Sequence, residues 1–273
     1  MAPHLAASVI LLREPRAGTL EVCMLRRRRG ASFMASAFVF PGGGVDPGES
    51  LEECAARELF EESSVALLAP REPGAAARAP ELPALRSAFA ADGVDALTRA
   101  GWRWDVGALQ PWSHWITPSQ EPKRFSAHFF VAALPDGQVP TFDDVETKEQ
   151  TWVDPRDAEA RAAELSLPPP QLRTLWELRE LRSIEEVFAA GRARAAEPHP
   201  ILPRMAPLSA EEQRPGGAPF ALLLPWDPEY LTCGQGEVGA MSAPPSWATG
   251  PSRFVMEDRA WRHRVAPGST SAG

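Results

Sequence analysis

Residues 43–65, GGVDPGESLEECAARELFEESSV, join a glycine-rich turn to a segment with helical spacing. Ser50 and Glu53 have the S-x-x-E spacing of a capping box, in which each side chain bonds the other residue's backbone N–H. A helix is therefore predicted to start at Ser50. Ala55 and Leu59 recur one turn apart, and we expect them to belong to its buried stripe.

The polar face of this predicted helix is crowded with carboxylates. Glu58 and Glu62 lie one turn apart, with Glu61 beside them. Like charges at this spacing destabilise a helix by about 0.2–0.5 kcal/mol per pair. A bound cation would offset that repulsion, and oxygen ligands suit Mg²⁺ or Mn²⁺. An ordinary acidic surface helix is the competing interpretation, but the fixed offsets of the glycine turn, Glu49 and Arg57 favour a metal site.

The spacing resembles the Nudix box, G-x5-E-x7-R-E-U-x-E-E-x-G-U, where U is a bulky aliphatic residue. Every specified position matches except one, because Ser64 stands where the box has glycine. That departure predicts a slightly different or mildly strained turn after the helix. The resemblance implies an α/β fold, the Nudix-type α/β/α sandwich with a mixed β-sheet. It also implies Mg²⁺-dependent hydrolysis of a diphosphate bond.

The resemblance further implies roles for residues of the box. Glu58, Glu61 and Glu62 would supply carboxylates to Mg²⁺ or Mn²⁺, helped by the backbone carbonyl of Gly42 or Gly43. The metal would neutralise charge on the diphosphate and lower the pKa of a bound water. One of these glutamates, or a carboxylate on a loop, would take the proton from the attacking water.

Glu49 and Arg57 are expected to form a buried or half-buried ion pair that orients the helix. Among loop carboxylates, family members often place an acidic residue three positions before a strand aromatic. Here that favours Glu149, ahead of Trp152, over Glu146. A solvated loop charge is the alternative interpretation of Glu149. The predicted catalytic set is Glu58, Glu61, Glu62, Arg57, Glu49 and Glu149.

Candidate substrate contacts lie outside the box. Arg26, Arg27 and Arg28 form a basic run shortly before the glycine turn. They are interpreted either as phosphate contacts or as a solvated strand end. Trp115, together with Trp112, would stack on an adenine, and core packing is the alternative.

Short motifs elsewhere resemble one branch of the Nudix family, which includes the mammalian peroxisomal coenzyme A diphosphatases and many bacterial relatives. The likeness covers roughly residues 5–190. The motifs are Ser32-Phe33-Met34, Phe40-Pro41-Gly42-Gly43, Trp115-Ile116-Thr117-Pro118, Lys123-Arg124-Phe125 and Phe129-Phe130. The resemblance implies coenzyme A or acyl-coenzyme A as substrate. ADP-ribose, NADH and a broad substrate range remain alternatives. A non-catalytic nucleotide-binding Nudix module is a weaker one, because all the box glutamates are present.

The chain is predicted to contain a Nudix domain over residues 1–196, with an inserted segment at about 70–100. Residues 197–273 are predicted to be a Pro- and Gly-rich extension that packs on the domain, with 266–273 disordered. The predicted strands are 5–13, 20–27, 37–40, 109–116, 124–134 and 150–153. The predicted helices are 50–63, 83–92, 154–165, 171–181 and 183–195.

Composition narrows the class of partner. With 273 residues, 44% of them hydrophobic, the chain can bury a large core. A net charge of −8 argues against general nucleic-acid binding, which needs a basic surface. No apolar run approaches the roughly 20 residues that span a bilayer. We therefore expect a cytoplasmic protein acting on a small nucleotide diphosphate, without a membrane partner, and either monomeric or homodimeric.

Overall fold

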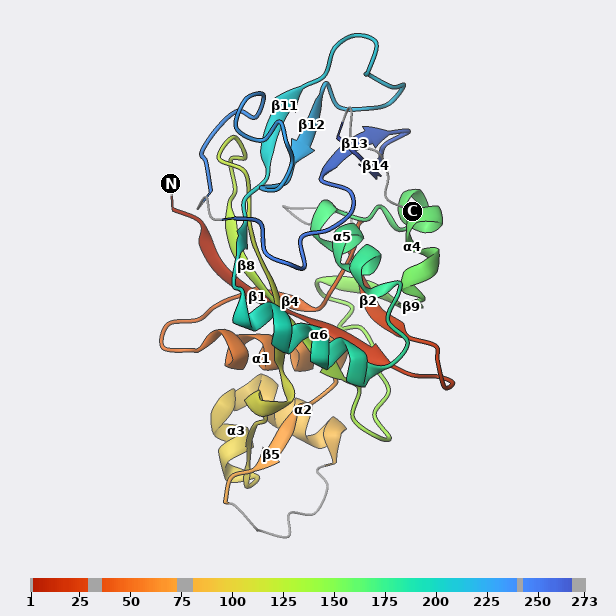
Figure 1. The fold of residues 1–273 in the computed structure, drawn as a ribbon. Helices are drawn as coiled ribbons and strands as arrows, with labels where there is room; N and C mark the ends of the chain where they lie inside the picture. Colours follow the sequence, from red (N-terminus) through yellow and green to blue (C-terminus); the bar gives the residue numbers. More distant parts are fainter. Residues whose placement is uncertain (1, 29–35, 73–80, 240–242, 267–273) are drawn as a thin grey trace.

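A computed structural model describes residues 2–28, 36–72, 81–239 and 243–266. Residues 32–34 of the branch motif and 267–273 of the predicted disordered end lie outside this described part. Within it, none of the helices is both long and apolar enough to cross a bilayer. Figure 1 shows a central sheet flanked by helices, with the C-terminal extension above it and the inserted segment below.

The central sheet has eight strands and mixed direction. Strand β1 pairs in parallel with β8 along its length, and β10 pairs in parallel with β7. The other pairings are antiparallel. The strands are β1 (His4–Arg13), β2 (Glu21–Arg27), β3 (Phe38–Val39), β4 (Gly42–Gly44), β7 (Gln110–Ile116), β8 (Phe125–Ala133), β9 (Thr147–Val153) and β10 (Pro200–Ile201).

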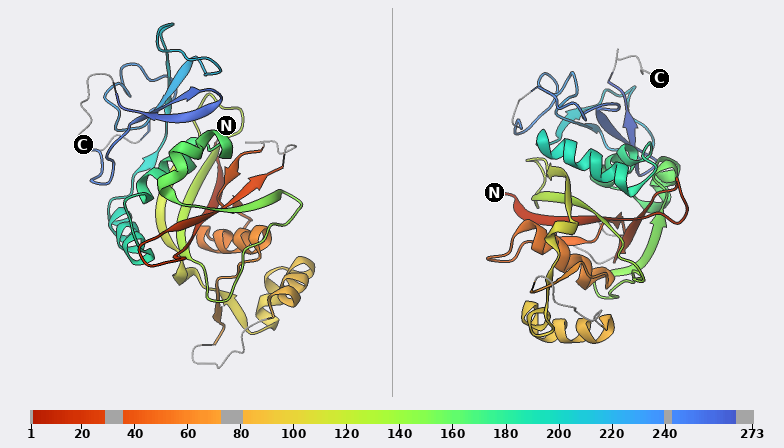
Figure 2. Two further views of the ribbon diagram at one scale, coloured as in Figure 1. Left: turned by 90° about the vertical axis from the view of Figure 1, so that its right-hand side faces the viewer. Right: turned by 60° about the horizontal axis from the view of Figure 1, so that its bottom comes forward.

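Helices cover both faces of this sheet, as Figures 1 and 2 show. Because successive strand residues point to opposite faces, Ile10 and Leu12 of β1 belong to one core cluster and Val9 and Leu11 to another. The first cluster includes residues of α4 (Ala158–Leu165), α5 (Pro169–Leu178) and α6 (Ile184–Ala196). The second includes residues of α1 (Leu51–Ser63). The predicted α/β/α sandwich is confirmed.

The helices after the sheet differ slightly from the predicted ranges. Helix α5 begins at Pro169, because prolines are tolerated in a first turn, where the N–H groups have no intrahelical partner. A 3₁₀ turn, η2 (Pro155–Asp157), precedes α4, and Asp154 caps it as expected. Ser183 caps α6, but the Glu186 carboxylate accepts the N–H of Arg182 at 2.7 Å. The S-x-x-E spacing of Ser183 and Glu186 therefore forms only half of a capping box.

The inserted segment is more ordered than the sequence predicts. It contains β5 (Leu68–Pro70), α2 (Leu82–Asp92), α3 (Val94–Arg99), β6 (Trp102–Trp104) and the 3₁₀ turn η1 (Val106–Ala108). Strands β5 and β6 pair with each other. Phe60 of α1 packs edge-on against Phe89 and Trp104, with ring centroids 5.5 and 5.9 Å apart. The segment therefore extends the core around α1.

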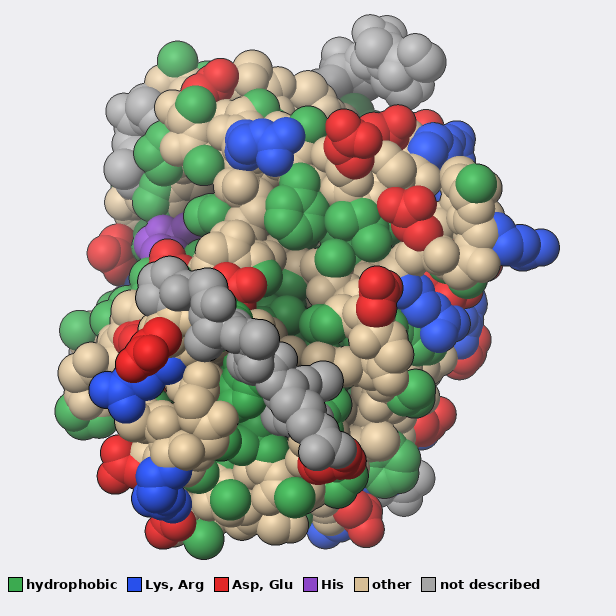
Figure 3. Space-filling model, turned by 90° about the horizontal axis from the view of Figure 1, so that it is seen from below, with side chains coloured by type: hydrophobic (Ala, Val, Ile, Leu, Met, Phe, Trp, Pro, Cys, Tyr) green, Lys and Arg blue, Asp and Glu red, His purple; other side chains and the backbone are tan. Residues whose placement is uncertain are grey.

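The view from below in Figure 3 includes this segment, and acidic and basic side chains are interspersed there with hydrophobic ones.

The extension contains regular strands, which the sequence did not indicate. Four antiparallel strands form a second sheet in the order β11-β12-β13-β14. They are β11 (Arg204–Pro207), β12 (Phe220–Leu223), β13 (Arg253–Glu257) and β14 (Ala260–Arg264). Each strand is short, and a long loop separates β12 from β13. Local alternation is therefore too brief to indicate pairing that depends on distant residues.

Candidate active site

Helix α1 and the glycine turn are built as one unit. The capping box is present: Ser50 Oγ accepts the N–H of Glu53 at 3.2 Å, and the Glu53 carboxylate accepts the N–H of Ser50 at 2.9 Å. At the other end Ser64 has φ 61°, a left-handed conformation that costs a residue with a Cβ about 1 kcal/mol or more. The expected strain at the position of the missing box glycine is confirmed.

The glycine turn lies directly against two glutamates of α1. Gly42 donates its N–H to Glu62 Oε2 at 2.9 Å. A Cβ on Gly43 would lie 2.4 Å from Glu58 Oε1, which is closer than real contacts allow. A side chain at Gly43 would therefore displace the Glu58 carboxylate from the turn. This contact places both carboxylates behind the turn.

Glu62 is buried and Glu58 is largely buried, and of the two only Glu58 has a cationic hydrogen-bond partner within the described residues, Arg57. Burial raises the pKa of Glu62 to about 8, and the Gly42 N–H offsets this only in part. Burial also raises the pKa of Glu58, against the opposing effect of Arg57. Two buried carboxylates that resist ionisation would be stabilised in their charged form by a cation. The donor set thus fits a hard divalent metal.

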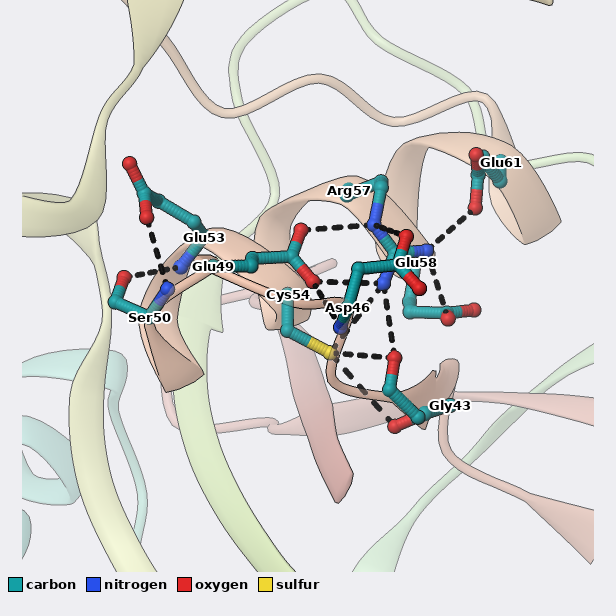
Figure 4. Close-up of polar contacts among 10 residues, drawn as sticks. Gly43, Asp46, Glu49, Ser50, Glu53, Cys54, Arg57, Glu58 and Glu61 are labelled. Carbon is teal, nitrogen blue, oxygen red and sulfur yellow. Dashed lines mark hydrogen bonds and ion pairs between the residues drawn. The ribbon is translucent and has the colours of Figure 1, made fainter. Parts of the chain in front are cut away.

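Arg57 lies among three carboxylates (Figure 4). Its Nε and Nη2 donate to Glu49 at 2.8 and 2.9 Å. Its Nη1 donates to Glu58 Oε1 at 2.8 Å and to Glu61 Oε2 at 2.9 Å. The hydrogen bond to Glu49 raises the pKa of Arg57 further above its usual range. Burial acts to raise the pKa of Glu49, but the hydrogen bonds from Arg57 and from the Asp46 N–H, together with the charge of Arg57, lower it overall. The predicted Glu49–Arg57 pair is present and is bidentate.

Glu61 does not join the other two glutamates in this arrangement. Its side chain is 44% exposed and is held by Arg57. Accordingly, no group of three or more His, Cys, Asp or Glu side chains among the described residues is arranged to hold a metal. Glu58 and Glu62 lie against the glycine turn, whereas Glu61 would have to leave Arg57 to join them; Glu58 shares the same Arg57 Nη1.

A cavity of about 530 Å³ lies on the other side of the glycine turn. Gly42, Gly43, Arg27 and Glu146 line it. Arg27 and Glu146 both influence the pKa of Glu62, so they lie at the end of the cavity nearest the turn. Trp115 lines the cavity as well, but it is also buried in the core beside Trp112, as the alternative interpretation of this residue expects.

The three predicted arginines have different surroundings. Arg27 lines the cavity, and its Nε is buried without a hydrogen-bond partner among the described residues. Arg26 instead pairs with Glu149, with 3.0 Å between Nη1 and Oε2. Arg28 bonds Asp144 on an exposed surface. Only Arg27 of the run is therefore placed to contact a bound anion.

The structure favours Glu146 over Glu149 at the cavity. Glu149 lies on β9, its side chain is 49% exposed, and it does not line the cavity. Glu146 lies just before β9 and does line it. The sequence preference for Glu149 relied on its distance from Trp152. The position of the loop relative to α1 depends instead on the pairing of β9 with β2.

Trp112 packs in the core, and its Nε1 donates to Glu177 at 3.1 Å, so adenine stacking by this residue is not supported.

Several residues that line the cavity were not identified from the sequence. They include Met205, Phe220 and Trp261 of the extension. The sequence does show apolar patches within 201–205 and 220–226, which contain Met205 and Phe220. No local pattern indicates where these patches lie in the fold.

Comparison with known proteins agrees with this geometry. The family model described as NUDIX domain matches residues 2–83, and the NUDT19 Nudix domain matches residues 47–179. "Putative nudix hydrolase 7" of Caenorhabditis elegans is 32% identical over 184 residues, covering 65% of this chain and 61% of its own. "Acyl-coenzyme A diphosphatase NUDT19" of Homo sapiens is 32% identical over 167 residues, covering 51% of this chain and 42% of its own.

The chain thus spans less than two thirds of the length of these relatives. Among solved structures, a NUDIX hydrolase from Alicyclobacillus acidocaldarius superposes with a TM-score of 0.60 at 23% identity. That match covers 69% of this chain and 96% of the other, and it shows the same fold. With a nearly complete box, two Nudix family models that together span residues 2–179, and this fold, the chain belongs to the Nudix hydrolase family.

Proposed function

We propose that this protein hydrolyses the diphosphate bond of a nucleoside diphosphate derivative with the help of a divalent metal ion, and that coenzyme A or acyl-coenzyme A is its substrate. One observation carries the proposal. The buried carboxylates of Glu58 and Glu62 contact a glycine turn that forms the wall of a cavity lined by Arg27. Such a site joins metal ligands to a place for a diphosphate.

Glu58 and Glu62 would hold the metal, and Glu61 would complete the set after leaving Arg57. The backbone oxygens of Gly42 and Gly43 are further candidate ligands. When bound, the metal supplies charge neutralisation at the phosphoryl oxygens and a water of lowered pKa. Mg²⁺ is the proposed ion, with Mn²⁺ as the alternative, because both prefer oxygen ligands.

The other side chains would bind and orient the substrate. Arg27 carries a positive charge at the cavity wall and would contact diphosphate oxygens. Glu146 faces the cavity near Glu62, and we propose that it accepts the proton of the attacking water. Glu149 is the alternative base, although its bond to Arg26 holds it away from the cavity. Arg57 positions α1 through Glu49.

The coenzyme A proposal is supported by the match to the NUDT19 Nudix domain and by the similarity to the Homo sapiens acyl-coenzyme A diphosphatase NUDT19. Membership of the family by itself does not select the substrate. ADP-ribose, NADH and a broad substrate range are the competing possibilities within the same chemistry.

Product analysis with Mg²⁺ tests the proposal. Coenzyme A, acetyl-coenzyme A, ADP-ribose, NADH and a diadenosine polyphosphate would be compared as substrates. Release of 4′-phosphopantetheine and 3′,5′-ADP from coenzyme A, with one water consumed, is the expected result. Preference for another member would overturn the coenzyme A assignment and keep the hydrolysis. Absence of cleavage with either Mg²⁺ or Mn²⁺ would overturn the catalytic proposal and favour a nucleotide-binding module.

A further inference from the structure

The C-terminal sheet forms part of the cavity wall. Met205 of β11, Phe220 and Leu222 of β12 and Trp261 of β14 line the cavity, together with Pro203. These extension residues lack charged groups, and the Trp261 indole is their only side chain with a hydrogen-bond donor. The same cavity therefore contains the glycine turn and a wall of apolar side chains.

The Nudix domain continues this apolar wall. Trp115, Phe125 and Phe129 line the cavity from strands β7 and β8. Met205 and Phe220 pack against the same core cluster that contains Trp115 and Phe129. At about 530 Å³ the cavity falls within the range of roughly 300–1,000 Å³ typical of small-molecule sites. It can hold a substantial apolar group at the wall formed by the extension.

The extension is held in place by hydrogen bonds and an ion pair to the Nudix domain. Arg173 of α5 is 1% exposed and donates to the carbonyls of Thr249 and Pro251 at 2.8 and 2.9 Å. Arg124 pairs with Glu237 at 2.9 Å. Because these bonds fix the extension on the Nudix domain, the apolar wall is preformed.

Resting on the proposed function, we infer that the sheet β11–β14 forms a subsite for the acyl group of an acyl-coenzyme A, so that the enzyme favours longer acyl thioesters over free coenzyme A. An acyl chain is the occupant because it needs no hydrogen-bond partner. A purine base carries polar atoms on its edge, and burying them against Met205, Phe220 and Leu222 would leave them unpaired. The charged and polar side chains that line the cavity come from the Nudix domain, so they are available to the rest of the substrate; they include Arg27, Thr117, Glu121, Lys123, Glu146 and Gln171.

The subsite has a measurable consequence. Each methylene that leaves water for the cavity strengthens binding by about two- to fourfold until the space is filled. Because this contact lies away from the diphosphate, it is the same in the ground state and the transition state. It should therefore lower KM with little change in kcat.

Steady-state kinetics of the full chain would test this with coenzyme A and its acetyl, butanoyl, hexanoyl and octanoyl thioesters. For the unmodified protein, kcat/KM is expected to rise with chain length through KM. In Met205→Gln, which keeps side-chain length and adds a polar amide, the rise per methylene is expected to flatten. Leu231→Gln changes an extension residue that is 56% exposed and outside the cavity, so it should keep the original slope.

The outcomes separate this inference from the proposed function. Hydrolysis with equal kcat/KM across the series would overturn the acyl subsite and leave the diphosphatase intact. A uniform loss in Met205→Gln for all thioesters and for coenzyme A would also overturn it, in favour of the adenine as occupant. If no member of the series is hydrolysed, both the inference and the coenzyme A proposal fail. The unmodified series decides the question even if Met205→Gln does not fold.

Discussion

At the scale of single residues, the site depends on how closely a backbone can approach a carboxylate. Gly43 permits contact with Glu58, and Gly42 supplies the one hydrogen bond that Glu62 receives within the described structure. A buried carboxylate with one neutral partner is costly, and the proposed metal site would account for it. The single residue Glu62 should therefore matter far more to activity than to folding.

We expect Glu62→Gln to lower Mg²⁺-dependent hydrolysis by about 100-fold or more, since an amide is a poor ligand for a hard cation. The fold should be kept, because glutamine can still accept the Gly42 N–H. Glu52→Gln on the same helix is the matched control and should retain activity. Product release and circular dichroism measure the two effects. A folded Glu62→Gln protein with near-normal turnover would refute the metal assignment.

Ser64 shows how a departure from the family pattern is accommodated. Its Oγ bonds Arg86 of the inserted segment and lies 2.9 Å from Thr141 Oγ1. Ser64→Ala loses both bonds and keeps the left-handed strain, so its free energy of unfolding should fall by about 1 kcal/mol. Ser64→Gly loses the bonds but also relieves the strain, so its free energy of unfolding should lie between those of the original protein and Ser64→Ala. Urea denaturation measures both, and an alanine variant as stable as the original would show that these bonds contribute nothing.

At the scale of elements, strands β7 and β8 bring two histidines face to face. His114 and His128 are directly paired across the strands, with ring centroids 3.9 Å apart and planes at 16°. Burial, with a smaller contribution from His128, lowers the pKa of His114 to about 4. Burial also lowers the pKa of His128. Both rings are therefore neutral in the folded protein at neutral pH.

This pair predicts a pH dependence of stability. Below about pH 6.5 the unfolded chain binds protons that the folded rings do not, so the free energy of unfolding should fall as the pH decreases. Above about pH 7 both states are neutral and this loss is absent. The double variant His114→Gln/His128→Gln should flatten the decline between about pH 7 and pH 5. Exposed His4→Gln is the control, and an unchanged slope in the double variant would contradict the assignment.

At the scale of the whole molecule, a buried charged cluster joins the Nudix domain to its extension. Glu177 of α5 accepts Trp112 Nε1 at 3.1 Å and Arg173 Nε at 2.7 Å, and it pairs with Arg194 at 3.0 Å. The Arg194 guanidinium also stacks over Trp112 and over Trp247 of the extension, 4.1 and 4.7 Å from the ring centroids. The extension is thus anchored through α5 and α6.

We expect Arg173→Ala to lower the free energy of unfolding by about 3 kcal/mol, because it removes two hydrogen bonds to the extension and leaves the buried Glu177 carboxylate with less compensating charge. The loosened extension should also be cleaved by protease sooner than the Nudix domain. Arg192→Ala, on an exposed part of α6, should do neither. Denaturant titration with limited proteolysis distinguishes the two variants. Equal stability would show that the cluster does not hold the extension.

The sequence by itself determined the local parts of this protein. Helix α1, its capping box, the Glu49–Arg57 pair and the glycine turn lie within one short stretch, where fixed spacing decides which side chains meet. Only the tertiary structure decided that Arg27 and Glu146, rather than Arg26 and Glu149, line the cavity, and that β11–β14 complete its wall. Those contacts depend on strand pairings between residues far apart in the chain, and spacing within a segment carries no information about such pairings.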